Sequence, residues 1–249
     1  SMHRRAAALA ATAARSIVFE AIWREDTSVA ISAARLTIDP LHWDPANPPR
    51  FGTTHPLTQR WVSWEMPSRF DAATGRLLAS SVVDSAFTGS QDIVMVDSGT
   101  IRVLARYPRD DVDPNFTVDG RGMLFVTTRW APQSVDDYDI GYMAFGDTAV
   151  RPIVTDREVE KSPRQSPDGT RVAYLRDTRE STADAICITT MRGGKGVCHR
   201  LSGLRSLALD GWLDNSHLLI RGLQSGRQRL MSLDLATLTH RMLIEYDAK

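Results

Sequence analysis

The sequence lacks the features that mark several broad classes of protein. It has two cysteines in 249 residues, and aromatic residues make up 7% of it. No apolar run approaches the roughly 18 residues that a membrane-spanning helix needs. Its 30 basic and 30 acidic residues leave no formal net charge, which argues against a general nucleic-acid-binding or anionic-membrane surface. We therefore expect no nucleic-acid partner and no membrane insertion.

Motifs of common enzyme chemistry are missing as well. The sequence contains no P-loop, no G-x-S-x-G elbow, no H-E-x-x-H and no dinucleotide fingerprint. Its six histidines are scattered without metal-ligand spacing. Hydrophobic residues nevertheless make up 42% of the chain, enough for one substantial core. One closed domain is favoured over two.

A repeated turn is the most informative feature that is present. In its clearest form, Ser166-Pro167-Asp168-Gly169 leads into an apolar segment at residues 171–175. The repeated turn positions are Gly75, Gly120, Gly169 and Asn215, which are 45, 49 and 46 residues apart. A period of about 40–50 residues in β-rich units indicates a propeller. Glycine and asparagine suit the turn because they tolerate the positive φ that a tight hairpin needs.

Each repeat contains four short segments in which apolar and β-branched residues alternate with polar ones. In the clearest repeat these segments are residues 162–166, 171–175, 185–189 and 197–201. Alternation at period two predicts half-buried strands. Pro152 fits an outer edge strand, where the missing N–H interrupts no ladder. We predict an all-β propeller of four-stranded blades, with four repeats over residues 61–249.

The N-terminal part is less regular. Residues 6–14 are rich in alanine and favour a helix over a strand, so residues 1–15 are predicted to be a helical or disordered leader. A short signal peptide is the alternative. Residues 16–60 are interpreted as a degenerate first blade with a proline-rich insertion at 39–55. Together with the four repeats this predicts five blades within residues 16–249, and six is the alternative.

Two segments, residues 160–174 and 111–126, resemble the TolB-like repeat, also called the WD40-like PD40 repeat. That pattern has an acid, Ser-Pro, an aromatic residue, Ser-Pro-Asp-Gly and an apolar strand; the second segment has Thr117-Val118 in place of Ser-Pro. The resemblance covers residues 61–249 and implies a β-propeller fold. It implies no single function, because propellers of this type serve binding, scaffolding and enzyme-accessory roles.

Three acids are candidate site residues. Aligning the repeats on their turns places Glu65, Asp111, Glu160 and Ser206 at one equivalent position, at the mouth of the inner strands. The three carboxylates would then surround the central channel and bind a divalent cation or a basic ligand. The alternative is an acid typical of the repeat that hydrogen-bonds the backbone of the neighbouring blade. We expect no cofactor apart from such a cation.

Arg129 and Trp130 are the candidate recognition pair on the rim of the same face. They lie in the predicted loop at 128–137, and both residue types are enriched at binding hot spots. Packing of Trp130 over a blade edge is the alternative.

Cys187 and Cys198 flank a glycine-containing turn that lies midway between them. They should face each other across one hairpin, within cross-strand reach. A disulfide there would imply an oxidising compartment, and hence a periplasmic or extracellular protein. The alternative is a pair of small buried apolar residues, compatible with a cytoplasmic protein.

Two classes of function are compatible with these observations. The first is a non-enzymatic, TolB-like propeller that binds a protein partner, a small molecule or a glycan at the channel-mouth face. The second is a glycosidase- or lyase-like enzyme that uses Glu65, Asp111 and Glu160. A glycosidase needs one acid with a raised pKa and an ionised acid about 5 to 10 Å away. The missing enzyme motifs favour binding. A third hypothesis is an accessory propeller of a longer, peptidase-like chain.

Overall fold

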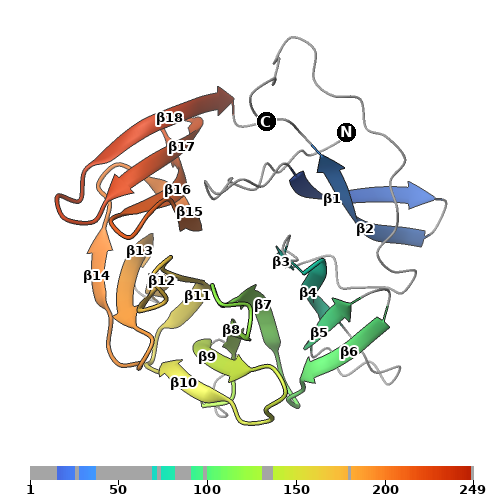
Figure 1. Ribbon diagram of the computed structural model, residues 1–249. Helices are drawn as coiled ribbons and strands as arrows, with labels where there is room; N and C mark the ends of the chain where they lie inside the picture. The colour runs from blue at the N-terminus through green and yellow to red at the C-terminus, as the bar shows by residue number, and fades with distance from the viewer. Residues whose placement is uncertain are drawn as a thin grey trace.

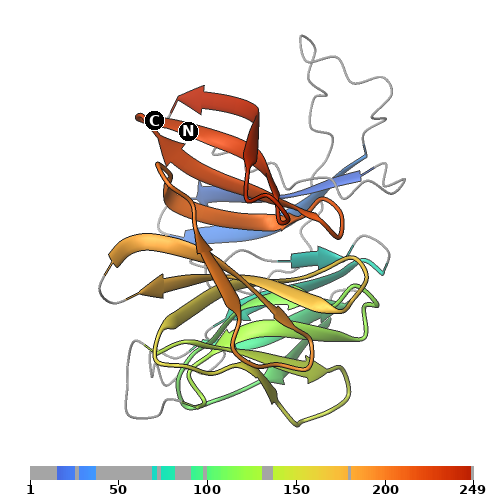
Figure 2. The ribbon, with the colours of Figure 1, turned by 90° about the vertical axis from the view of Figure 1, so that its left-hand side faces the viewer.

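The computed structural model describes residues 16–25, 28–37, 69–71, 74–81, 91–97, 100–130, 137–178 and 181–247. In these residues the chain is built from strands and contains no helix. The strands form sheets arranged in a ring (Figure 1). Seen from the rim, the strands of the last two sheets run from one face of the ring to the other (Figure 2).

Four of the sheets are four-stranded and antiparallel, with their strands in sequence order. The first contains β3 (Arg69–Asp71), β4 (Arg76–Ser81), β5 (Asp92–Asp97) and β6 (Thr100–Ala105). The second contains β7 (Asp111–Phe116), β8 (Gly122–Thr127), β9 (Asp139–Ala144) and β10 (Arg151–Val154). The third contains β11 (Val159–Gln165), β12 (Arg171–Thr178), β13 (Ser181–Thr190) and β14 (Val197–Arg200). The fourth contains β15 (Arg205–Trp212), β16 (His217–Gln224), β17 (Arg227–Asp234) and β18 (His240–Asp247).

These four sheets are the blades that the four repeats predict. The first strand of each lies nearest the centre of the ring and the fourth lies at its rim (Figure 1). Pro152 lies on β10, the outer edge strand of its blade, as predicted.

A fifth, two-stranded sheet pairs β1 (Ser16–Glu25) with β2 (Ser28–Thr37). It lies in the ring between the β15–β18 and β3–β6 blades (Figure 1). Its two strands fall within residues 16–60, where the degenerate first blade is predicted. The count of five blades stays a prediction. The leader at 1–15 and the insertion at 39–55 lie outside the described residues.

Neighbouring blades are joined by apolar side chains from alternate faces of each central strand. Met123 and Phe125 of β8 share a core cluster with Leu78 of the preceding blade. Leu124, between them, belongs to the cluster that contains Tyr174 of the following blade. All of β8 is buried. The expectation of half-buried strands is therefore wrong for β8, because alternation sorts its side chains between two apolar layers rather than between core and solvent.

The predicted turns differ in how they are made. Positive φ angles of 75°, 65° and 74° occur at Gly75, Gly120 and Gly169. Asn215 has no positive φ, so that part of the expectation is wrong. In this turn Asp214 Oδ1 accepts hydrogen bonds from the backbone N–H groups of Ser216, at 2.6 Å, and His217, at 2.8 Å. Asp119 and Asp168 accept in the same way from the N–H groups of Arg121 and Thr170, at 3.0 Å each, so the aspartate acceptor is what these three turns share.

Three inner strands share a second irregularity, a bulge at one residue with positive φ. These residues are Asp113 in β7, Ser162 in β11 and Ser206 in β15. The predicted equivalence of Ser206 with Asp111 and Glu160 is therefore wrong, because those acids lie two residues before their bulges. Leu204 occupies their position in the last blade. The turn position lies nine residues after the bulge residue in β15 and seven in β7 and β11, because four register pairs rather than two follow the bulge and an additional irregularity lies between Leu209 and Gly211.

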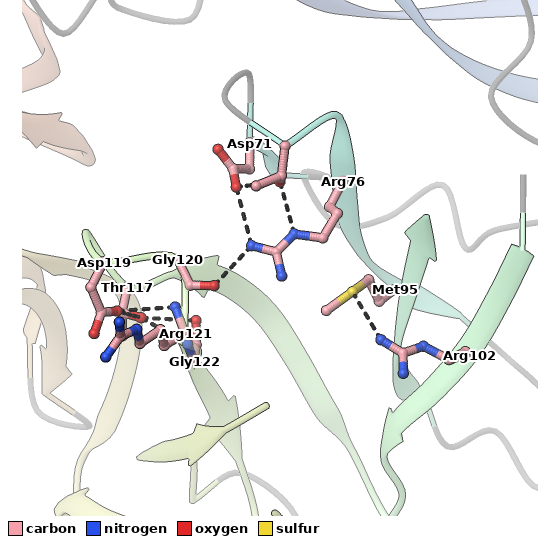
Figure 3. A network of polar contacts seen from close by, with 10 residues as sticks. Asp71, Arg76, Met95, Arg102, Thr117, Asp119, Gly120, Arg121 and Gly122 are labelled. Atoms are coloured by element: carbon pink, nitrogen blue, oxygen red, sulfur yellow. Dashed lines mark hydrogen bonds and ion pairs between the residues drawn. The ribbon is translucent and has the colours of Figure 1, made fainter. Parts of the chain in front are cut away.

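The inner turns link each blade to the next. Arg76 Nη2 donates to the backbone oxygen of Gly120 at 2.8 Å, and also contacts Asp71 in its own hairpin (Figure 3). At the next junction the N–H of Val118 donates to Gln165 Oε1 at 2.8 Å. At the third, the N–H of Asp168 donates to the side-chain oxygen of Asn215 at 3.0 Å. These contacts tie the inner turns of neighbouring blades together.

Candidate functional site

Asp111 begins β7 and is fully buried. Its Oδ1 accepts hydrogen bonds from Thr127 Oγ1 at 2.6 Å and Arg129 Nε at 3.2 Å, and its Oδ2 pairs with Arg129 Nη2. Its backbone N–H donates to the oxygen of Gln91 in the preceding blade at 2.9 Å. Burial raises the pKa of Asp111 above its usual value, while Arg129 and Thr127 oppose the rise.

Glu160 on β11 occupies the same place one blade later and is also fully buried. Arg176, its register partner on β12, donates from Nε to Glu160 Oε1 at 3.1 Å, and its Nη2 pairs with Asp156. The backbone N–H of Glu160 donates to the oxygen of Tyr138 in the preceding blade at 2.8 Å. Burial, followed by a hydrogen bond to Asp156 and the charge of Asp156, raises the pKa of Glu160 to about 9. The raised pKa favours the protonated form of this carboxyl group at neutral pH.

A second buried acid faces each of these two from the third strand of the preceding blade. Asp92 starts β5 and its charge raises the pKa of Asp111; Asp139 starts β9 and its charge raises the pKa of Glu160. Burial, with the charges of Asp137 and Asp156, raises the pKa of Asp139 itself to about 7. Two consecutive blade junctions thus contain an inner-strand acid that is held by an arginine and faced by a second buried acid.

The corresponding positions of the next junction are apolar. Ala185 occupies on β13 the position that Asp139 occupies on β9, since each is the register partner of the residue at the end of the second strand, Arg176 and Thr127 respectively. Leu204, which is buried, takes the place of the inner-strand acid. The acid pair is therefore a property of particular junctions and is not required for two blades to pack.

Asp111 and Glu160 lie at two different blade junctions. The main charges acting on Asp111 are those of Arg129 and Asp92, whereas those acting on Glu160 are Asp156, Arg176 and Asp139. Glu65 lies outside the described residues. Among the described residues no group of three or more His, Cys, Asp or Glu side chains is placed to hold a metal ion.

The predicted recognition pair follows directly after β8. Arg129 is 21% exposed; besides Asp111, it contacts the backbone oxygen of Arg106 at 3.0 Å and lies over the ring of Tyr107 at 4.8 Å. Trp130 is half-buried, and a Cβ built on Gly141 of β9 would lie 3.3 Å from its Cη2 atom. Trp130 therefore packs against its own blade and keeps part of its surface exposed.

Charged residues on the inner strands form a second feature, which the sequence analysis does not single out. Asp113 Oδ1 lies 3.8 Å from Arg69 Nη2 of the preceding blade and 3.9 Å from Arg164 Nη1 of the following one. Arg164 Nε donates to the backbone oxygen of Asp210 at 3.4 Å. Burial and the charge of Arg69 lower the pKa of Arg164 to about 9. No motif in the sequence marks these residues, because their contacts depend on how successive inner strands lie beside one another.

Cys187 on β13 lies opposite Cys198 on β14, as the hairpin predicts. Their Cα atoms are 4.0 Å apart and their sulfur atoms are joined as a disulfide. The bond closes the hairpin whose turn contains Gly193 and Gly194, both with positive φ.

No family model and no curated protein matches the sequence. In structure the chain is similar to TolB from Acinetobacter baumannii, with a TM-score of 0.65 and 14% identity over 91% of this chain and 50% of that one. It is also similar to a putative TolB from Agrobacterium tumefaciens, with a TM-score of 0.55 and 16% identity over 75% of this chain and 62% of that one. The fold is a TolB-like β-propeller.

An enzyme shares this fold. Oligogalacturonate lyase from Vibrio parahaemolyticus matches with a TM-score of 0.56 and 13% identity, over 94% of this chain and 64% of that one. The chain spans half to about two thirds of the length of these three proteins. At such identities the likeness establishes the TolB-like propeller fold and leaves the activity to be argued from the site. No helix in the described part of the chain is long and apolar enough to cross a membrane.

Proposed function

We propose that this chain is a non-enzymatic binding propeller that holds a protein partner, a small molecule or a glycan at the channel-mouth face. In this proposal Arg129 and Trp130 on the rim contact the ligand. Asp111 and Glu160 brace the blades beneath them, and Glu65 belongs to the same ring of positions. A periplasmic or extracellular location suits the proposal, because a disulfide between Cys187 and Cys198 persists in an oxidising compartment.

The burial of the two acids is the observation that supports binding over catalysis. A catalytic acid or base must come within hydrogen-bonding reach of the substrate. Asp111 and Glu160 are both fully buried, and one carboxylate oxygen of each accepts a hydrogen bond from an arginine of its own blade. These carboxyl groups are thus engaged inside the protein, whereas Arg129 and Trp130 keep part of their surface exposed.

A binding screen with matched variants tests the proposal. Arrays of oligosaccharides and peptides identify a ligand, and its affinity is then measured for Trp130→Ala, Glu160→Gln and, as a control on the inner-turn face, Val118→Ala; Val118 is 54% exposed. Loss of a rim hot spot should weaken binding by about tenfold or more. Glu160→Gln and Val118→Ala should bind as the unaltered protein does. Unchanged binding by a folded Trp130→Ala protein would contradict the proposal.

A carbohydrate-active enzyme is the second candidate. It is favoured by the raised pKa of Glu160, since a proton-carrying carboxyl group is what a general acid requires, and by the shared fold of oligogalacturonate lyase. Incubation with oligogalacturonate and with neutral oligosaccharides, followed by product analysis, separates the two candidates. If the unaltered protein cleaves a sugar and the Glu160→Gln variant does not, the chain is an enzyme. If the unaltered protein and the variant both bind a sugar and leave it intact, the binding function is supported.

A further inference from the structure

A hollow of about 610 Å³ lies between β10 of one blade and the β13–β14 hairpin of the next. The β10–β11 loop, residues 155–158, forms one wall, and the hairpin turn, residues 192–195, forms the other. Its lining does not include Arg129 or Trp130. Sites for small ligands commonly have volumes of about 300–1,000 Å³, so the hollow is large enough for one.

The charge of the lining is unbalanced, although the whole chain has no net charge. Its basic side chains are Arg157, Arg176, Arg192 and Lys195; its acidic ones are Asp156 and Glu158. Arg176 and Asp156 are paired with each other. Arg157, Arg192 and Lys195 are exposed and enter no ion pair with a described residue. Three cations from two separate segments therefore face one hollow.

The hairpin wall is held in place by three features of the chain. The N–H of Gly194 donates to the backbone oxygen of Ile153 on β10 at 2.9 Å. Gly193 allows this approach, since it has a φ of 90° and a Cβ there would lie 3.0 Å from the same oxygen. The disulfide between Cys187 and Cys198 closes the hairpin behind the turn. Arg192 and Lys195 are thus carried on a braced turn, which lowers the entropy lost when they bind.

We propose that this hollow is a second binding site, for a small organic anion that presents a carboxylate or phosphate group to Arg157, Arg192 and Lys195. Arginine forms paired hydrogen bonds with either group, and lysine adds a compact charge. Ile153 and Val154 of β10 also border the hollow, but their side chains are buried in the core, so recognition rests on the three cations.

Isothermal titration calorimetry at low ionic strength tests the site with inorganic phosphate, succinate and glucuronate, and with glucose as the uncharged match for glucuronate. At least one anion should bind and glucose should not, and the phosphate and carboxylate arms distinguish the two chemistries. Arg192→Gln combined with Lys195→Gln should weaken binding by at least about tenfold, since two charge-assisted hydrogen bonds are lost. Added salt should weaken binding as well.

The matched control is Arg205→Gln, which removes an exposed charge that is not part of the lining. It should bind as the unaltered protein does. All three variant positions are exposed, so thermal unfolding should show that each variant folds. The proposal is overturned if none of the anions binds, if the double variant binds like the unaltered protein, or if Arg205→Gln loses as much affinity as the double variant.

Discussion

The Nε atom of Arg176 lies 3.1 Å from Oε1 of Glu160, and the glutamate is fully buried at the junction of two blades. The guanidinium group also pairs with Asp156. Because the pKa of Glu160 is raised to about 9, the resting cluster at neutral pH holds a neutral glutamic acid beside an arginine–aspartate ion pair. This charge balance lowers the cost of burying the carboxyl group, whose Oε2 atom accepts no hydrogen bond in the described part of the chain.

Glutamine should replace Glu160 with little loss, because its amide reproduces the oxygen acceptor and the donor of a protonated carboxyl group. Near pH 4 we expect Glu160→Gln to change the free energy of unfolding by less than about 1 kcal/mol. At pH 7 the same variant should be more stable than the unaltered protein, because glutamine is neutral in both states whereas Glu160 must take up a proton on folding. Near pH 4 Glu160→Ala should cost about 2–4 kcal/mol, because it leaves a cavity and an unpaired guanidinium N–H. Urea unfolding of both variants measures this. Equal losses in the two variants would show that the ionised form is the one that stabilises the junction.

Stability should fall as pH rises through the neutral range. The folded-state pKa values of Glu160 and Asp139 are about 9 and about 7, above the ordinary values of 4.5 and 3.8. Across these intervals the folded protein binds more protons than the unfolded chain, so the free energy of unfolding decreases with pH. The decrease begins near the ordinary pKa values and ends near pH 9.

Two amide variants assign the decrease to its sources. Glu160→Gln should remove the part between about pH 7 and 9, and Asp139→Asn should reduce the part below about pH 7. Unfolding free energies at a series of pH values provide the measurement. A profile that rises over this range, or one that neither variant alters, would contradict the assignment.

Gly196 should tolerate no side chain. A Cβ at this position would lie 2.3 Å from the hydroxyl oxygen of the buried Tyr174. Gly196→Ala should therefore destabilise the protein by about 1–3 kcal/mol through overpacking. Gly211 is the matched control, because a Cβ there meets no atom within 4 Å. Gly211→Ala should be close to neutral in the same thermal unfolding experiment, and an equal loss in both variants would count against the tight packing.

The disulfide between Cys187 and Cys198 should be present in protein folded under oxidising conditions. Mass spectrometry after alkylation should detect free thiols only once the protein has been reduced. Closing a loop of sequence separation 11 should stabilise the fold by about 2–3 kcal/mol, which reduction removes. A Cys187→Ala/Cys198→Ala protein is the control and should not respond to reductant. Free thiols before reduction would leave the two cysteines as buried apolar neighbours.

The strands and most turns could be predicted because their signals are local. Apolar alternation and the Asp-Gly turns at Gly120 and Gly169 specify a hairpin wherever they occur. The position of Ser206 could not be predicted in this way. A glycine inside a strand, here Gly211, often marks a bulge, but it does not tell how many register pairs separate the bulge residue from the turn.

The candidate site was less predictable because its contacts depend on register between distant segments. Arg176 meets Glu160 only through the β11–β12 register, which a bulge at Ser162 displaces. Acids at the start of a strand suggest a solvent-facing group, yet both Asp111 and Glu160 are fully buried by the preceding blade. The hollow beside Arg192 requires two blades to be in place and has no local signature.

The carboxyl ¹³C resonance of Glu160 gives the most direct test of the central claim, that this acid braces two blades and takes no part in chemistry at an open mouth. Protein labelled at the glutamate side-chain carboxyl carbon is titrated by NMR, with the resonance assigned by its loss in Glu160→Gln. We predict a pKa of about 9 for Glu160 that ligands of the channel-mouth face do not change. Titration near the ordinary value of 4.5, with a shift when such a ligand binds, would contradict it.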